Sequence, residues 1–271
     1  MAKTKPKYEE YKKWLKDEHH VEITDKYYEE AANTIKGIFQ ESSLWKAFNH
    51  NRSYYSDTFF IESRGYSLWS NASETVELKT KPYDSFLLKT YRRNILDNQK
   101  WPKQPRGGWI LPDNWYSKIN DIVRTSVVVR YLDGVEFVAR HFKSLCDKNK
   151  AKCNIHFEAK EEGYYAAHMY VTSKFEVPKM GLGTEFIEVS IEIQITTQLQ
   201  EVILKLLHEY YEERRKQEKL KENIKWQWDY KSDEFATNYL GHILHYIEGM
   251  IMERRDKMEV QKNETRIHGV S

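Results

Sequence analysis

The sequence predicts an α+β fold in which a mixed β-sheet of about five strands is flanked by helices. Three observations lead to this prediction. Strand-type and helix-type segments alternate in the order strand, helix, strand, strand, strand, helix. Residues 126–132 form a β-branched run, which is typical of a buried strand. Residues 191–196 alternate between isoleucines and polar side chains, so one face of the sheet should be apolar and the other polar.

Helical spacing dominates the first 40 residues. Tyr8, Tyr11, Trp14 and Leu15 recur at helical intervals, and a second such pattern occupies residues 25–40. Residues 41–70 are rich in Ser and Tyr without a clear period, although residues 58–61 are compatible with a short strand. We therefore expect a helical N-terminal region over residues 1–70.

The predicted sheet falls in the middle of the chain, and residues 71–225 are expected to be the core domain. Its strands are predicted over residues 75–79, 126–132, 154–159, 164–177 and 185–195, with helices over 134–148 and from 198 to about 225. Residues 81–93 are predicted to be a loop that continues into a helix, and 100–118 a Pro- and Gly-rich ordered loop. The remainder, 226–271, is predicted to be a C-terminal helix, from 234 to about 257, and a tail.

Composition narrows the class of protein. Hydrophobic residues make up 40% of the 271 residues, which is enough for a core, and the formal net charge of +2 does not by itself indicate a nucleic-acid binder. The two cysteines lack metal-type spacing and fit a reducing cytosol. The N-terminus lacks the apolar segment of a secretory signal, and no long uncharged apolar run predicts a membrane span. We expect a cytoplasmic protein.

Cations cluster where the first predicted strand leads into a helix. They would suit a triphosphate, helped by backbone amides at the start of the helix. The residues of this segment are Lys79, Lys81, Ser85, Lys89, Arg92 and Arg93. For this stretch alone, a solvated basic loop is the simpler explanation.

Two carboxylates complete the requirements of phosphoryl-type transfer. Asp121 precedes the β-branched strand, and Glu192 lies in the alternating run. Mg²⁺ prefers one or two carboxylates together with phosphate oxygens, so this pair is sufficient. Glu192 could instead act as a general base. The alternatives are a strand-start cap for Asp121 and an ordinary solvated sheet face for Glu192.

Polar and aromatic residues near the third and fourth predicted strands could bind an acceptor. Tyr164 can stack on a base, Gly163 permits close approach, and His168 can reach a phosphate. Lys160, Gln194 and His208 belong to the same set. An aromatic strand packed in a core is the alternative for the tyrosines, and a lone helical histidine such as His208 is usually structural.

In order and spacing, these motifs resemble the synthetase domain of the RelA/SpoT family over residues 75–212. Residues 163–168 resemble its Gly-Tyr-x-Ser-x-His motif, and residues 121–126 resemble Asp-Ile-Ala-Gly-Ile-Arg. The family's basic loop has the spacing of Lys79, Lys81, Ser85 and Lys89. The resemblance implies a nucleotidyltransferase-like fold and a Mg²⁺-dependent pyrophosphokinase that moves a diphosphate from ATP to a ribose 3′-hydroxyl. Asp121 and Glu192 would be the catalytic metal ligands.

The sequence also departs from the family pattern. Ser126 replaces the arginine that stacks on the ATP adenine, and Lys79 replaces its partner. Arg124, two residues earlier on the same strand face, could substitute. The family's Ile-Arg-Thr is here Ile-Thr-Thr, with Thr196 in the middle, and Ala166 replaces a serine. The His-Asp motif of the family's hydrolase domain is absent, so we expect synthesis without degradation.

The acceptor has two main candidates. Standard members of the family use GDP or GTP, whereas toxin-type small members modify the 3′-terminal adenosine of tRNA or adenine nucleotides. Neutral residues on the acceptor side favour tRNA, and residues 12–16 and 214–219 supply cations for a phosphate backbone. An inactive nucleotide-binding or protein-interaction module is the alternative from another class. A neutralising antitoxin protein and a homo-oligomer are left open as partners.

Overall fold

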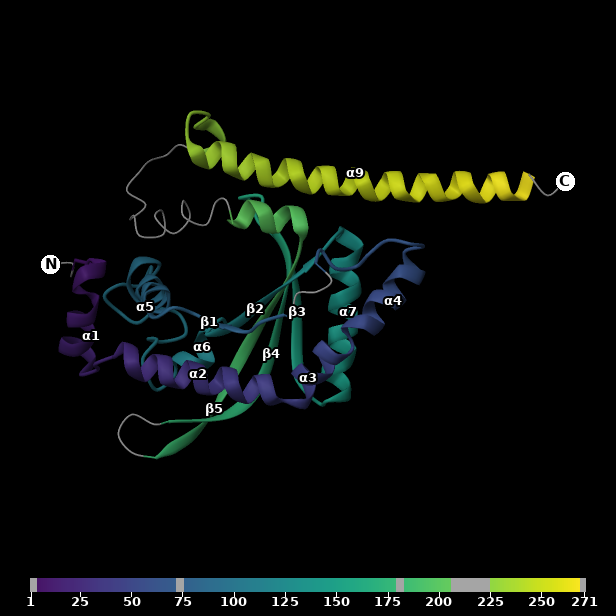
Figure 1. Ribbon diagram of the computed structural model, residues 1–271. Helices are drawn as coiled ribbons and strands as arrows, with labels where there is room; N and C mark the ends of the chain where they lie inside the picture. Colours follow the sequence, from purple (N-terminus) through teal and green to yellow (C-terminus); the bar gives the residue numbers. More distant parts are fainter. Residues whose placement is uncertain (1–3, 72–75, 179–182, 206–224, 269–271) are drawn as a thin grey trace.

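The computed structural model describes residues 4–71, 76–178, 183–205 and 225–268 of the protein, and its centre is a five-stranded mixed sheet (Figure 1). The strands lie in the order β1-β2-β5-β4-β3, and only β2 and β5 are parallel. Their bounds are β1 Lys79–Thr80, β2 Val123–Val129, β3 Lys152–Ala159, β4 Tyr165–Pro178 and β5 Thr184–Thr197. The predicted fold class, a mixed sheet of five strands with flanking helices, is confirmed.

The sheet has one apolar and one polar face because its strands alternate in the way that the sequence predicts. Ile191, Ile193 and Ile195 of β5 are fully buried, whereas Glu192 and Gln194 between them are only partly buried. In β2, valines and Thr125 are buried at every second position. Both strands therefore direct apolar side chains into the same core.

Helices cover the apolar face. α2, α6 and α7 pack on the sheet, α3 and α4 pack on α7, and α5 lies beside α2 (Figure 1). The main helices are α1 Tyr11–His19, α2 Asp25–Glu41, α3 Ser43–His50, α4 Arg52–Glu62, α5 Tyr83–Tyr91, α6 Trp115–Lys118, α7 Leu132–Lys148 and α9 Asp233–His268. Residues 198–205, directly after β5, are also helical. In the described part of the chain, none of the helices has the length and apolar character needed to span a membrane.

Several predicted elements differ from the structure. The C-terminal helix, predicted to end near residue 257, extends to His268, and Trp115–Lys118 of the predicted loop form α6. Residues 58–61, proposed as a strand, lie in α4, where Tyr55 and Phe59 are buried one helical turn apart. The predicted strand over residues 75–79 is reduced in the described residues to Lys79–Thr80, because Pro82 caps the start of α5 directly afterwards. Lys79 and Lys81 therefore lie within a few residues of the start of α5.

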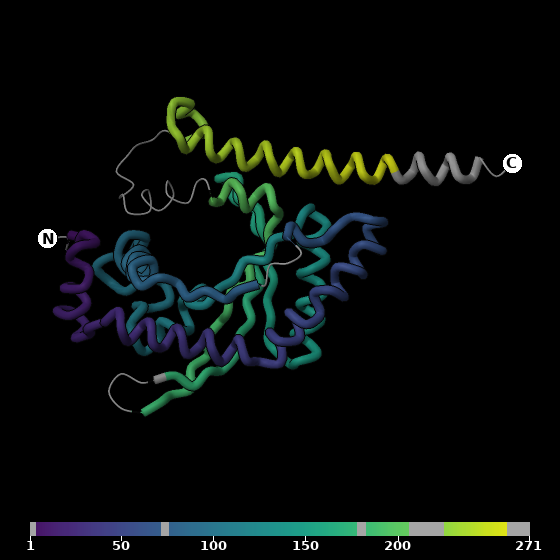
Figure 2. Tube along the Cα trace, viewed as in Figure 1, coloured from purple at the N-terminus to yellow at the C-terminus, as the bar shows by residue number. Residues whose placement is uncertain are grey.

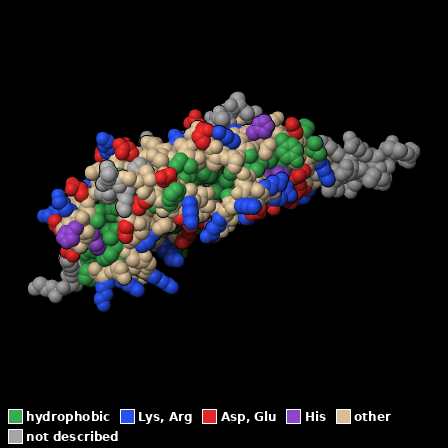
Figure 3. Space-filling view, turned by 90° about the horizontal axis from the view of Figure 1, so that it is seen from below, with side chains coloured by type: hydrophobic (Ala, Val, Ile, Leu, Met, Phe, Trp, Pro, Cys, Tyr) green, Lys and Arg blue, Asp and Glu red, His purple; other side chains and the backbone are tan. Residues whose placement is uncertain are grey.

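The last described element is one long helix, α9, which contacts α7 of the helical layer. Figures 1 and 2 show α9 running past the end of the sheet, beside the helix that follows β5. Gln200 of that helix donates to the carbonyl oxygen of Gly241 in α9 at 3.5 Å. On the face shown in Figure 3, basic and acidic side chains are interspersed, in keeping with the small net charge.

Candidate active site

The candidate site lies on the polar face of the sheet, where strand register brings distant residues into rows. Arg124 of β2 pairs with Lys79 of β1 on one side and with Glu192 of β5 on the other. Glu192 in turn pairs with Tyr170 of β4. Side chains of one such row project to the same face, so the polar residues of four strands meet there.

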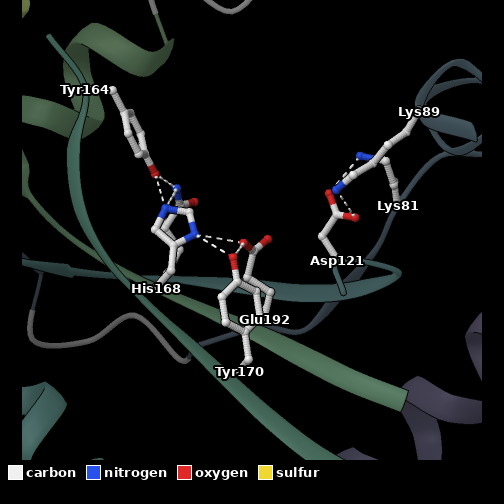
Figure 4. A network of polar contacts seen from close by, with 8 residues as sticks. Lys81, Lys89, Asp121, Tyr164, His168, Tyr170 and Glu192 are labelled. Atoms are coloured by element: carbon white, nitrogen blue, oxygen red, sulfur yellow. Dashed lines mark hydrogen bonds and ion pairs between the residues drawn. The ribbon is translucent and has the colours of Figure 1, made fainter. Parts of the chain in front are cut away.

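A continuous hydrogen-bond chain leads to Glu192 (Figure 4). The Tyr164 hydroxyl lies 2.8 Å from Nε2 of His168, and Nδ1 of His168 lies 2.8 Å from Oε1 of Glu192. Gln194 donates to the Tyr164 oxygen, and the Tyr170 hydroxyl donates to the same Glu192 oxygen at 3.1 Å. All of these donors are satisfied when His168 carries its proton on Nδ1, which is the tautomer that the network assigns.

The two tyrosines in this chain are held in their protonated form. Burial raises the pKa of Tyr164, and the charge of Glu192 raises it further. The same two causes raise the pKa of Tyr170. A tyrosine that keeps its proton remains a hydrogen-bond donor, so Tyr170 donates to Glu192 and Tyr164 donates to His168.

Asp121 lies beside this chain but has cationic partners. Its Oδ2 accepts from Nζ of Lys81 at 3.0 Å, and its Oδ1 accepts from Nζ of Lys89 at 2.8 Å (Figure 4). Burial alone would raise the pKa of Asp121, but the charges and hydrogen bonds of the two lysines outweigh it and lower the pKa to about 2. Burial in turn lowers the pKa of Lys81, against the opposing effect of Asp121. Asp121 is therefore ionised at neutral pH.

The donor set fits a Mg²⁺ ion that is bound together with a triphosphate. Hydrogen bonds from described residues reach only Oε1 of Glu192, which leaves Oε2 for a metal. Asp121 supplies a second ionised carboxylate. Within the described ranges, no group of three or more His, Cys, Asp or Glu side chains could hold a metal alone. Phosphate oxygens would therefore have to complete the coordination, as is usual for Mg²⁺.

The predicted ATP-binding residues divide into two groups. Lys81 and Lys89 converge on Asp121, and Lys79 and Arg124 lie in one row of the polar face. Neither Lys79 nor Arg124 forms an ion pair with another described residue. Partly buried Ser85 lies in the first turns of α5. Arg92 pairs with Asp97, and Arg93 donates to the Lys118 carbonyl oxygen, so these two arginines are engaged outside the Asp121 cluster.

The predicted acceptor residues are also brought together only in part. Tyr164, His168 and Gln194 form one cluster. The ammonium of Lys160 lies 4.8 Å from the centre of the Tyr164 ring. Gly163 does permit a close approach, but the partner in this structure is α9. His208, together with residues 214–216 of the predicted basic stretch, lies outside the described residues.

Tyr170 is the site residue that sequence reasoning missed. An aromatic β-strand packed in a core was the alternative for the tyrosines of this strand, and only Tyr164 was given a functional role. A usable signal was present, since Tyr170 follows His168 by two residues and so belongs to the same strand face. His156 is a second such residue, paired in register with His168 and exposed.

Comparisons with known proteins give matches at the level of structure only. No protein-family model matches the chain, and no curated protein matches it. Among solved structures, small alarmone synthetase 1 from Bacillus subtilis, bound to its product pppGpp, is 15% identical. That match has a TM-score of 0.49 and covers 86% of this chain and 94% of the other. A GTP pyrophosphokinase family protein from Streptococcus pneumoniae is 17% identical, with a TM-score of 0.46 and coverage of 93% and 96%.

Proposed function

We propose that the protein is an ATP-dependent pyrophosphokinase that transfers the β,γ-diphosphate of ATP to a ribose 3′-hydroxyl. One observation supports this most strongly. Asp121, held by Lys81 and Lys89, lies two residues before β2, and Glu192, held by His168, lies on the polar face of the sheet in one row with the cations Lys79 and Arg124. This combination supplies cations for phosphates, ligands for Mg²⁺ and a proton acceptor, which are the requirements of phosphoryl-type transfer.

In the proposed reaction, the acceptor 3′-oxygen attacks the β-phosphorus of ATP. The bond between this phosphorus and the oxygen bridging to the α-phosphate breaks, AMP leaves with that oxygen, and the hydroxyl proton passes to Glu192. Lys81 and Lys89 exchange Asp121 for phosphate oxygens when ATP binds. Asp121 and phosphate oxygens would hold a Mg²⁺ ion that neutralises phosphate charge, and Glu192 would be its second ligand in the alternative in which it is not the base. His168 and Tyr170 orient the Glu192 carboxylate.

The acceptor that we favour is the 3′-terminal adenosine of tRNA, which would make the protein a toxin that blocks translation. Where the family resemblance places an arginine and a serine, this chain has Thr196 and Ala166, and both are buried. The position of Thr196 thus lacks the cation that the family motif places near a guanosine di- or triphosphate. Lys12, Lys13 and Lys16 are exposed on α1 and could contact a phosphate backbone. An activity of this kind would call for a neutralising antitoxin protein.

Synthesis of guanosine alarmones from GDP or GTP is the second candidate. It is favoured by Tyr164, whose half-buried ring next to His168 could stack on guanine as well as on adenine. This alternative needs the same carboxylates and lysines, so only the acceptor distinguishes it.

The deciding experiment offers [γ-³²P]ATP with either GDP or deacylated tRNA to the full-length protein. We expect label on tRNA, with AMP as the co-product. Transfer to tRNA should fall steeply with salt, because phosphate contacts dominate such binding, whereas the use of a free nucleotide should be less sensitive. Efficient synthesis of labelled guanosine tetraphosphate without label on tRNA would reject the tRNA proposal. Transfer to neither acceptor would favour a non-catalytic nucleotide-binding or interaction module.

A further inference from the structure

The start of β4, which carries the acceptor cluster, is in backbone contact with α9. A Cβ atom at Gly163 would lie 2.3 Å from the Asn238 carbonyl oxygen and 2.9 Å from the His242 nitrogen, both in α9. A Cβ atom at Gly241 would lie 2.3 Å from the Gly163 carbonyl oxygen. Such distances exclude any side chain, so the two backbones touch only because both residues are glycines.

Side chains on either side of this contact reinforce it. The Tyr165 ring stacks on His245 with centroids 3.6 Å apart and planes 7° apart. The Tyr165 hydroxyl lies 2.8 Å from Nδ1 of His242, and Nε2 of His242 lies 2.9 Å from the carbonyl oxygen of Glu161. His242 thus contacts Glu161 and Tyr165, which lie on either side of Gly163 and Tyr164 in the chain.

A second anchor holds α9 farther along its length. The Arg255 guanidinium lies 3.7 Å from the centre of the Tyr66 ring and 4.8 Å from that of Tyr131. It also donates to both carboxylate oxygens of Asp133 in α7, at 3.0 and 3.3 Å. Guanidinium stacking and ion pairing at a site only 8% exposed give α9 a fixed placement on the core.

We propose that α9 positions the acceptor side of the active site: the contact of Gly241 with Gly163 sets the position of Tyr164, and through it the hydrogen-bond chain to Glu192. The inference rests on the proposed pyrophosphokinase function. Gly163 directly precedes Tyr164, and the Tyr164 hydroxyl is the outer end of the chain that passes through His168. A shift of this backbone would move the ring on which an acceptor base stacks. Gly163, Tyr165, Gly241 and His242 are thus positioning residues rather than catalytic ones.

The helix itself supplies a matched pair of variants. Gly241 and Gly249 are both interior residues of α9, so replacement by alanine removes the same intrinsic cost of glycine from the helix. At Gly249 the added Cβ atom has no other atom within 4 Å, whereas at Gly241 it meets the Gly163 backbone. Any difference between G241A and G249A therefore reports the contact and not helix propensity.

The experiment measures KM for ATP and for the acceptor, kcat, and hydrogen–deuterium exchange over residues 160–170 in full-length G241A, G249A and wild type. We expect G241A to raise the acceptor KM roughly tenfold or more and to speed exchange in that segment, since small misplacements near a reacting centre are costly. KM for ATP should stay within about twofold of the wild-type value. G249A should match wild type in every measurement.

If G241A does not fold, Y165F provides the second measurement. It removes the hydroxyl that contacts His242 but keeps the ring on His245. Loss of one hydrogen bond predicts an acceptor KM raised roughly two- to tenfold, again with little change for ATP. Wild-type acceptor KM and wild-type exchange in G241A, or in Y165F where that variant is used, would overturn the inference. A wild-type protein that transfers diphosphate to no acceptor would reject the proposed function, and the exchange comparison would then decide the positioning role by itself.

Discussion

The two carboxylates of the candidate site, Asp121 before β2 and Glu192 in β5, have different surroundings. Asp121 is held by two ammonium groups, whereas Glu192 accepts from the imidazole of His168 and the phenol of Tyr170. The two lysines beside Asp121 lie where phosphates would bind. The hydrogen bonds to Glu192 reach one carboxylate oxygen and orient it, which leaves the other oxygen for a proton or a metal.

Glu192→Gln should abolish diphosphate transfer while the protein stays folded. The substitution keeps the shape of a partly exposed side chain and removes its charge, so we expect kcat to fall at least roughly a hundredfold. Glu188→Gln is the control, since Glu188 lies on the same face of β5 but is exposed and pairs in register with Lys174. The readouts are transfer from labelled ATP and the circular dichroism melt. Near wild-type turnover in Glu192→Gln would reject the site assignment.

Asp121 should make stability depend on acidic pH. Its pKa in the fold, about 2, is below the ordinary value of 3.8, so its stabilising contribution is present above about pH 4 and is lost as the pH falls toward 2. A shift of this size corresponds to roughly 2 kcal/mol. Urea unfolding of wild type and Asp121→Asn at pH 7 and pH 3 measures it. We expect the variant to be less stable at pH 7 and the gap to narrow at pH 3, and an equal gap at both values would contradict this account.

Two variants of Tyr164 distinguish the effect of base stacking from that of the hydrogen bond to His168. Tyr164→Ala should weaken acceptor binding by ~1–3 kcal/mol, roughly one to two decades, through loss of base stacking. Tyr164→Phe keeps the ring and removes the bond to His168, so most acceptor affinity should remain. Isothermal titration with ATP and with the acceptor distinguishes the two effects. Equal losses for both ligands in Tyr164→Ala would place this tyrosine in a structural role.

The two carboxylates and the Tyr164–His168 pair could be predicted from sequence. Each of these polar side chains occupies a position that the alternation of a strand or the spacing of a motif identifies. Tyr170 was not predicted. Its position two residues after His168 indicates the strand face, but sequence alone does not distinguish a tyrosine that packs its ring from one that donates its hydroxyl to Glu192. The engagement of Arg92 with Asp97 was equally out of reach, since it depends on where the chain goes after α5.

At the scale of elements, the predictions were most accurate for long, buried segments whose apolar residues recur regularly. β2, β4, β5 and α7 lie within a few residues of the predicted ranges because each has an uninterrupted apolar pattern. Residues 58–61 were misjudged because a run of aromatic and β-branched residues fits a strand locally. In the fold, however, Phe59 contacts Phe137 of α7, which requires a helix. Tertiary packing thus decided what local propensity left ambiguous.

Glu248 of α9 provides a prediction at this scale. It is only 4% exposed, and burial raises its pKa, against the opposing effect of hydrogen bonds from the side chains of Thr197 and Gln200. The facing titratable group is His245, whose Nδ1 lies 3.8 Å away and whose pKa burial lowers. A raised carboxyl pKa means that stability is lost as the pH rises, since a charge must then be buried. Glu248→Gln should therefore raise the melting temperature more at pH 8 than at pH 5. A larger gain at pH 5 would contradict the assignment.

At the scale of the whole molecule, the two faces of the sheet have different roles. The apolar face packs against helices, and the polar face carries the candidate site. Helices α2, α6 and α7 cover the apolar side, and the polar side collects residues from four strands that are distant in sequence. The sequence could predict this division from alternation alone, but not the placement of α9. Glycines at positions 163 and 241 have no local signature that reveals a partner about 80 residues away in the chain.

The parallel pairing of β2 with β5 extends over six residue pairs, from Arg124 with Glu192 to Val129 with Thr197. If β5 slipped by one residue, Glu192 and Gln194 would turn into the core and three isoleucines would turn to water. Each exposed isoleucine would lose roughly 1.5–3 kcal/mol, and the buried carboxylate would cost several more. No misregistered state of comparable stability is therefore available, and a molecule that has paired these strands has aligned its reactive groups in the same step.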